Sequence, residues 1–462
     1  MKTNKITSAL LTLGLVSAAS VAMADSTVSI GGNSYKEVFF TGSTAARGNI
    51  FSAVTSATGI FAGTQTLEGP GGATPNSSSS SYTAYGHLGS STGPLYCICF
   101  SFTGSEAGIY ALEHLTSPEP DGTTGFNLPG TPNPTSFVDP TAGTSFSAQA
   151  DISMADTSQA VSLTPTPALH DAGLVGVVPF MWIKSYDSSP DASYTDLTNV
   201  SDDQVNINLG TEDQSAAFYT GRSADNDGVY IVGRNDGSGT RVNQLLDDQL
   251  GASFGVDQVA AADATYSGTP TTLTFGTIQP LTSAGGIQDV ADDGFDGGQF
   301  VAATIDDDVN GLGDTNGNGA GVILLGYVSI GDGLNAINGN STSSPVYPGG
   351  AKALTLNGVP ENDGTVEQGT YSFWGHEHMY SVPSPDATIT AVIQGFVGTA
   401  SANERLGTGH GPGGAFAGGG SAGFGGGEAS PYTTQNKMIA AQYMNADKGS
   451  DKDAGFPSQL TF

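Results

Sequence analysis

The sequence predicts an α/β fold, because three segments share one pattern in which an apolar strand leads through a turn of small residues into a helix. The strands are expected at 38–40, 95–102 and 229–232, and after each turn apolar residues recur at helical spacing. A fourth apolar run, at 175–183, is typical of a strand buried on both faces. A turn that opens a helix presents free backbone N–H groups, and the helix dipole favours an anion there.

The richest of these turns, 233–240, reads GRNDGSGT. Glycine has no Cβ, so a ligand can approach the backbone closely. Arg234 adds a planar guanidinium that suits a tetrahedral oxyanion, and Asp236 lies two residues further on, where it could hold that guanidinium in place. The N–H groups of 238–240 are expected to be unpaired at the helix start. This segment predicts an anion-binding loop.

Two further turns follow the same pattern. The turn at 41–48 reads TGSTAARG and the turn at 103–108 reads TGSEAG, and both combine hydroxyl groups with N–H groups at a helix start. Between them and the central loop lies the segment 150–156 (ADISMAD), which ends in Asp156.

Taken together and in this order, the four segments resemble the ligand loops of the periplasmic phosphate-binding proteins of ABC importers (PstS-like), which belong to the type 2 solute-binding proteins. The longest match is R-x-D-G-S-G-T at 234–240. The resemblance implies an α/β, two-lobed periplasmic-binding-protein fold (type 2) whose lobes are joined by two crossing strands. It places lobe I at 25–175 together with 380–462, and lobe II at 176–379, with a return strand between 354 and 380.

The resemblance also implies a set of phosphate-binding residues, and Asp236 is expected to support them from behind. Two positions depart from the family pattern, since the first turn is one residue shorter and Ala155 replaces a serine. The expected phosphate-binding residues are Ser43, Thr44, Ala45, Ser105, Asp156, Arg234, Ser238, Gly239 and Thr240.

Asp156 is the residue expected to choose between anions. Hydrogen phosphate carries a proton near neutral pH and can donate it to the Asp156 carboxylate, whereas sulfate has no proton and would meet a repelling acceptor. We expect no cofactor, no metal and no catalytic residue.

The implied function is high-affinity binding of inorganic phosphate in the periplasm and its delivery to an inner-membrane ABC phosphate permease by a monomeric protein that is not an enzyme. Three alternatives stay open. The ligand could be sulfate or arsenate, or the scaffold could serve a secreted structural or cell-surface role. A hydrolase would need one of the G-x-S-x-G matches, at 89–93 and 419–423, but neither has the strand before it and the helix after it that give this motif its meaning.

Residues 1–24 predict a secretory signal peptide, with Lys2 and Lys5 before an apolar run at 9–21 and the small-residue cleavage pattern Ala22-Met23-Ala24. The full chain has 13 basic and 44 acidic residues, a formal charge of −31. Removal of the signal takes away the two lysines, so the exported chain has a charge of about −33. Such a charge argues against nucleic acid and anionic membranes as partners.

Several other features carry weaker predictions. Cys97 and Cys99 are expected on one face of a strand, as buried thiols or as a strained disulfide. The segment 314–319 (DTNGNG) fits the first half of a calcium loop that starts at Asp314, but position twelve is Leu325 rather than an acid. His376 and His378 form a pair with no third metal ligand in view.

The remaining segments are predicted from composition and spacing. The stretches 63–94 and 117–143 are rich in Gly, Ser, Thr and Pro and are expected to be loops. An amphipathic helix is expected at 389–397 and a final helix at 438–444.

Overall fold

The structure is a computed structural model. It describes residues 26–397 apart from 56–58, 114–134, 212–213, 257, 259–263, 268–271, 276–293, 296, 311–320, 342 and 344, and it adds two short strands at 446–447 and 458–459. The expected signal peptide, the calcium-like segment 314–319, the second G-x-S-x-G match and the helix at 438–444 lie outside the described residues.

One large mixed sheet organises the fold, and the α/β prediction is confirmed. Its strand order is β11-β12-β15-β9-β18-β8-β2-β5-β4-β3, with β1 paired to β2 and β16 paired to β9. The central strands are β2 (Asn33–Gly42), β5 (Leu95–Ser101), β8 (Ile152–Ala155), β9 (His170–Lys184), β12 (Gly228–Val232), β15 (Val322–Ser329) and β18 (Trp374–Ser381).

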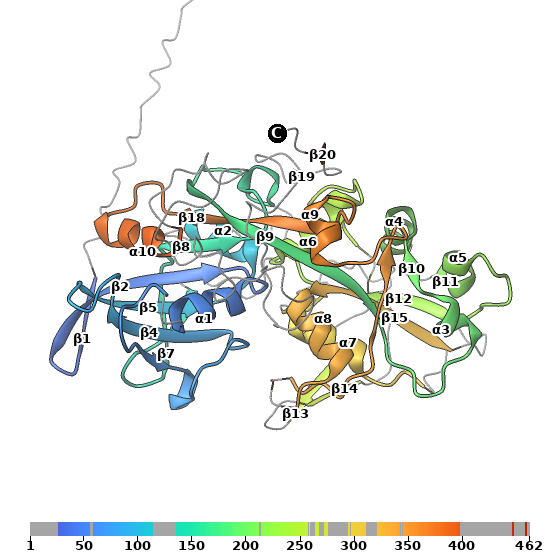
Figure 1. Ribbon diagram of the computed structural model, residues 1–462, viewed down its shortest axis with the longest axis horizontal. Helices are drawn as coiled ribbons and strands as arrows, with labels where there is room; N and C mark the ends of the chain where they lie inside the picture. Colours follow the sequence, from blue (N-terminus) through green and yellow to red (C-terminus); the bar gives the residue numbers. More distant parts are fainter. Residues whose placement is uncertain are drawn as a thin grey trace, which may run out of the picture.

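Two strands join the two halves of the molecule, as the sequence predicts. Figure 1 shows β9 and β18 running between a half that carries β2, β4 and β5 and a half that carries β12 and β15. The two strands pair antiparallel, with Trp374 opposite Pro179 and a register shift near His378. From Leu174 onward every residue of β9 is buried through β9's end at Lys184. We call these the first half (β2, β3, β4, β5, β8) and the second half (β11, β12, β15, β16).

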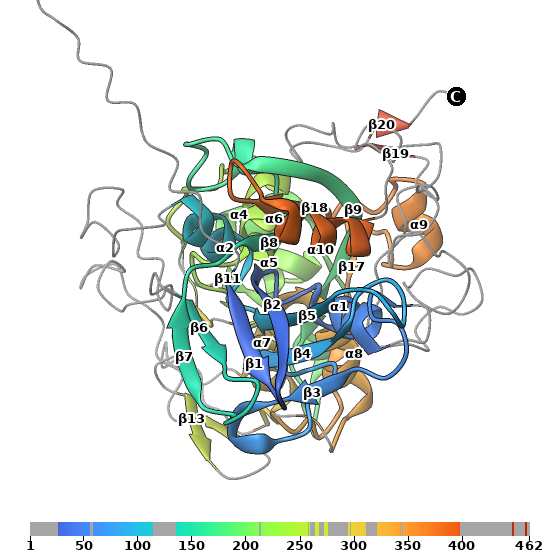
Figure 2. The ribbon, with the colours of Figure 1, turned by 90° about the vertical axis from the view of Figure 1, so that its left-hand side faces the viewer.

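Helices extend from the turns that follow the sheet strands. In the first half these are α1 (Arg47–Thr55) and α2 (Ser105–Glu113), and α10 (Ala387–Val397) packs near β2. Figure 2 shows this half from its end, with α10 above β2. The second half carries α6 (Gly239–Asp247), α7 (Gly298–Asp306) and α8 (Ile330–Asn338).

The remaining elements are short. The strands are β1 (Thr27–Ile30), β3 (Thr66–Glu68), β4 (Ser81–His87), β6 (Thr135–Val138), β7 (Ser145–Ala148), β10 (Asn199–Val200), β11 (Gln214–Ser215), β13 (Ala264–Ser267), β14 (Thr272–Phe275), β16 (Lys352–Ala353), β17 (Thr355–Leu356), β19 (Ala446–Asp447) and β20 (Ser458–Gln459). The helices are α3 (Ala192–Asp196), α4 (Asp202–Leu209), α5 (Ala216–Thr220) and α9 (Asp363–Glu367).

Aromatic side chains fill the core on both sides of the crossing strands. In the first half, Phe40 and Phe100 lie 5.3 Å apart between ring centroids, and Phe396 of α10 lies 5.4 Å from Phe40. In the second half, Trp182 of β9 contacts Tyr327 of β15 at 5.4 Å. This packing holds the ends of β2, β5 and β12, and therefore the three turns, in fixed positions.

The loop predicted at 63–94 is wrong, because it contains β3 and β4. Strand β4 pairs antiparallel with β5 along its whole length, and Tyr82 and Ala84 are fully buried. The alternation of these two apolar residues is short and lies among serines and glycines, so composition concealed a strand. The first G-x-S-x-G match lies in the turn between β4 and β5, so a strand and not a helix follows it. Its Ser91 is exposed.

The cysteines and the pair of histidines lie inside the sheet. Cys97 and Cys99 are buried free thiols, so of the two expected states the disulfide is excluded. His376 and His378 lie buried in β18. Among the described residues, no helix is long and apolar enough to cross a membrane.

Candidate functional site

The three glycine-rich turns meet at the junction of the two halves. The N–H of Gly104 donates to the carbonyl of Gly42 at 3.0 Å, which ties the turn after β5 to the turn after β2. The turn after β12 belongs to the other half. Its Gly237 carbonyl accepts hydrogen bonds from the N–H groups of Glu106 (3.1 Å) and Ala107 (3.3 Å). An oxygen of the protein itself therefore bonds to the N-terminal donors of α2, where an anion was expected.

Ser105 and Asp156 form the second contact of the site. The Ser105 hydroxyl donates to Oδ1 of Asp156 at 2.6 Å, and the N–H of Asp156 donates back to Oγ of Ser105 at 3.1 Å. Gly239, the first residue of α6, lies against both, since a Cβ built on it would be 1.7 Å from Asp156 Oδ1 and 2.7 Å from Ser105 Oγ. The residue must be glycine for the two halves to approach this closely.

Arg234 is almost fully buried, with 2% of its surface exposed. Its side-chain Nε donates to the carbonyl of Phe295 at 3.0 Å, and its backbone N–H donates to the hydroxyl of Tyr327 at 3.2 Å. Nη2 reaches the Thr44 hydroxyl of the first half at 3.5 Å. The guanidinium thus extends from the second half toward the turn after β2, where it contacts Thr44.

Asp236 was expected to hold the guanidinium of Arg234, but its ion pair is with another arginine. Its carboxylate forms an ion pair with Nη2 of Arg241 at 2.9 Å, and Nη1 of Arg241 donates to the Arg234 carbonyl at 3.1 Å. Asp236 therefore holds the backbone of the loop through Arg241. Burial raises the pKa of Asp236, and the neighbouring Arg241 opposes that shift.

The hydroxyl groups of Ser43 and Ser238 serve their own helix starts. Ser43 Oγ accepts from the N–H of Ala46 at 3.2 Å, and Ser238 caps α6 by accepting from the N–H of Arg241. The N–H of Ser238 donates to the Asn235 carbonyl, so the expectation that it is unpaired is wrong for this residue. Thr240 is buried in the first turn of α6, and Ala45 is partly exposed in the turn before α1.

An acidic side chain that the sequence did not single out lies behind the α2 turn. Glu106 is buried, and its two oxygens accept from the Thr157 hydroxyl (2.6 Å) and the Leu163 N–H (2.8 Å). Burial raises the pKa of Glu106 to about 7, although both hydrogen bonds oppose the shift and Asp156 adds to it. Two buried carboxyl groups, Glu106 in the α2 turn and Asp156 directly after β8, therefore lie at this end of the sheet.

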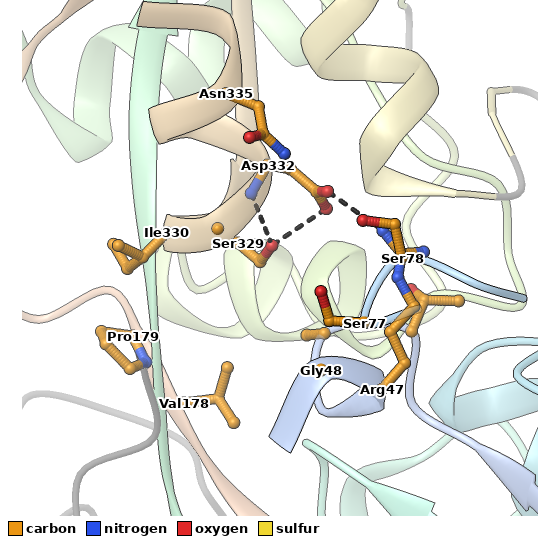
Figure 3. A pocket seen from close by; sticks show the side chains of 13 residues that line it. Arg47, Gly48, Ser77, Ser78, Val178, Pro179, Ser329, Ile330, Asp332 and Asn335 are labelled. Atoms are coloured by element: carbon orange, nitrogen blue, oxygen red, sulfur yellow. Dashed lines mark hydrogen bonds and ion pairs between the residues drawn. The ribbon is translucent and has the colours of Figure 1, made fainter. Parts of the chain in front are cut away.

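A polar pocket lies beside the meeting point, between the start of α1 and the start of α8 (Figure 3). Arg47, the first residue of α1, donates to Gln299 of α7 at 2.6 Å and forms an ion pair with Asp332 of α8 at 3.1 Å. Sequence reasoning missed all three residues. Only Arg47 gave a signal, as the single cation within the TGSTAARG turn.

The groups gathered at this junction are of the kinds that can bind an anion. Two buried guanidinium groups, Arg234 and Arg47, lie with hydroxyl groups and helix N-termini at the junction of the halves. Within the described part of the chain, no group of three or more His, Cys, Asp or Glu residues is arranged to hold a metal ion.

Comparison with known proteins gives similarity only at the level of solved structures, since no protein-family model and no curated protein matches the chain. A putative phosphate ABC transporter substrate-binding protein from Clostridium perfringens, solved with bound phosphate, is 13% identical with a TM-score of 0.39; the match covers 78% of this chain and 92% of that one. An ABC-type phosphate transport receptor from Vibrio cholerae is 12% identical with a TM-score of 0.34, over 76% and 90% of the two chains.

A third structure, PstS from Borrelia burgdorferi, is 10% identical with a TM-score of 0.31, over 78% of this chain and 92% of that one.

Proposed function

We propose that this protein binds inorganic phosphate between its two halves and delivers it to an ABC importer in the periplasm. The observation that carries the proposal is the meeting of three strand–turn–helix segments from opposite halves around Arg234. In the described conformation their donors bond to protein oxygens, namely Gly237 O and Asp156 Oδ1. Phosphate would enter after the halves separate and would take over these donors.

The energetics favour this exchange. Replacing a carbonyl by a phosphate oxygen at the Glu106 and Ala107 N–H groups keeps the number of hydrogen bonds and makes them charge-assisted. Each charge-assisted bond contributes roughly 1.5–3 kcal/mol, so a shell of about ten donors supports micromolar or tighter binding after the cost of closure. The net negative charge of the protein repels phosphate at long range, so short-range bonds must supply the affinity.

Asp156 would give the selectivity. It is 1% exposed and accepts from Ser105. A protonated oxygen of hydrogen phosphate can donate to its second oxygen, whereas sulfate cannot and would leave two anions facing each other. Phosphate is therefore favoured over sulfate, and arsenate, which also carries a proton near neutral pH, would compete with it.

Calorimetric titration of the exported chain, freed of ligand by partial unfolding, tests the proposal. We expect phosphate to bind with a Kd of about 1 μM or lower and sulfate to bind at least about a hundredfold more weakly. Asp156→Asn should reduce the difference in affinity between phosphate and sulfate. The control Asp151→Asn should preserve that difference, because Asp151 is a buried aspartate that accepts from the Phe39 N–H on the same sheet. Heat from neither anion would contradict the proposal.

A further inference from the structure

The pocket at the start of α1 contains an ion pair that connects the two halves directly. Arg47 belongs to the first half and Asp332 to the second (Figure 3). Gln299, which also accepts a hydrogen bond from Arg47, belongs to the second half. The side chains of Arg47 and Asp332 are only 6% and 8% exposed. Neither residue belongs to the phosphate-contact set that the motifs imply.

Each charged group of this pair is satisfied mainly by groups of the second half. Arg47 Nη1 donates to Gln299 at 2.6 Å and Nη2 to Asp332 Oδ1 at 3.1 Å. The other oxygen of Asp332 accepts from the Ser329 hydroxyl at 2.9 Å, and Ser329 caps α8. A buried ion pair is favourable only when further hydrogen bonds satisfy its charged groups, and Gln299 and Ser329 supply such bonds.

The two helix dipoles explain why Arg47, rather than Asp332, depends on contact with the opposite half. Arg47 is the first residue of α1, where the helix dipole disfavours a cation, so its own half is a poor environment for it. Asp332 lies in the first turn of α8, where an anion is favoured. Contact with the second half therefore compensates Arg47 for its position in the first half.

The pair also lies next to the candidate anion site. Arg47 is three residues from Thr44, which Arg234 contacts. A Cβ built on Gly298 would lie 2.6 Å from Asp332 Oδ2 and 3.6 Å from Arg234 Nη1, so both side chains approach the start of α7 at the same point. Separation of the halves breaks the Arg47 contacts at the same time as it moves Arg234 away from the turn after β2.

We infer that Arg47, Asp332 and Gln299 form an interlobe clamp that holds the two halves closed without any bound anion. The clamp sets the ratio of closed to open molecules, and through that ratio it sets both the apparent affinity and the rate of entry of any ligand of the cleft. The inference concerns this conformational ratio, so its test needs no anion and does not depend on phosphate binding.

Pulsed EPR distance measurement on ligand-free, spin-labelled protein tests the clamp. Labels are attached at Ser91→Cys in the turn between β4 and β5 and at Ile207→Cys on α4, which are exposed and lie in opposite halves. The native Cys97 and Cys99 are fully buried and do not compete for the reagent in the folded protein. Protein with the native clamp should give one dominant distance, that of the closed form.

Arg47→Met and Asp332→Asn should each add a second distance population, with the closed-to-open ratio reduced at least about tenfold, as expected for loss of a charge-assisted bond. The double variant should be no more open than Arg47→Met alone, because that change already removes the contacts of Arg47 with both Asp332 and Gln299. Arg222→Gln, which removes an exposed arginine paired with Asp196 within the second half, should leave the distribution unchanged. Distributions identical to that of the native clamp in both single variants, with unchanged thermal unfolding, would overturn the inference.

Discussion

The hydroxyl of Ser105 donates a hydrogen bond to the carboxylate of Asp156 at 2.6 Å and accepts one from the backbone N–H of Asp156 at 3.1 Å. They come from two different turns of the first half, and α6 of the second half begins directly against them at Gly239. The pair therefore forms the surface on which the two halves meet, and a small change in volume there acts on both closure and binding.

Gly239→Ala should destabilise the closed form, because the added methyl group would clash with Asp156 and Ser105. Overpacking of this kind costs roughly 1–3 kcal/mol. We expect a lower thermal unfolding temperature and weaker phosphate binding. The control is Gly255→Ala, at a glycine with no atom near the added Cβ; equal effects of the two changes would argue against close packing at Gly239.

Arg234→Gln should weaken phosphate binding about tenfold to a hundredfold or more, because a charge-assisted hydrogen bond is worth roughly 1.5–3 kcal/mol. The carbonyl of Phe295 holds Nε of the buried guanidinium, whose Nη2 reaches Thr44, and the shorter glutamine side chain cannot reproduce this reach. Calorimetry measures the change. Arg222→Gln removes the same charge at an exposed position, and an equal loss there would show that net charge, not Arg234 itself, governs affinity.

Stability should fall as the pH rises from 5 to 8, in part because of Glu106. Its pKa is raised from 4.5 to about 7 by burial, so between these values the unfolded chain has released a proton that the folded chain still holds. The contribution of Glu106 to stability is complete below about pH 4.5 and is lost as the pH rises through about 7.

Glu106→Gln removes this titration. Urea unfolding at pH 5, 6, 7 and 8 should show a decline in the free energy of unfolding that is smaller than in the native chain by on the order of 3 kcal/mol. Glu68→Gln, at a partly exposed acid on β3, serves as the control for the loss of one negative charge. Parallel slopes for Glu106→Gln and the native chain would contradict a raised pKa at this residue.

The sequence predicted the parts of the site that depend on neighbours along the chain. The turns after β2, β5 and β12 and the end of β8 are local patterns of glycine, hydroxyl groups and apolar spacing, and each was found at its place. The long strand β9 was visible for the same reason, as an unbroken apolar run.

The parts that depend on distant residues were not predictable. Arg47 and Asp332 are 285 positions apart in the chain, and nothing in either local sequence indicates the other. The partner of Asp236 was missed because Arg234 is nearer in sequence, whereas the first turn of α6 brings Arg241 to it. The contact of Gly237 with the start of α2 exists only when both halves are in place.

We propose above that an oxyanion binds between the turns at Arg234. An anomalous-scattering crystal structure with arsenate would locate such an anion directly. Arsenate shares the tetrahedral shape and the proton of hydrogen phosphate, and arsenic marks its own position. We expect an anomalous peak within hydrogen-bonding distance of the Arg234 guanidinium and of the Thr44 and Ser105 hydroxyl groups. A peak only at other positions, or no peak at saturating arsenate, would contradict it.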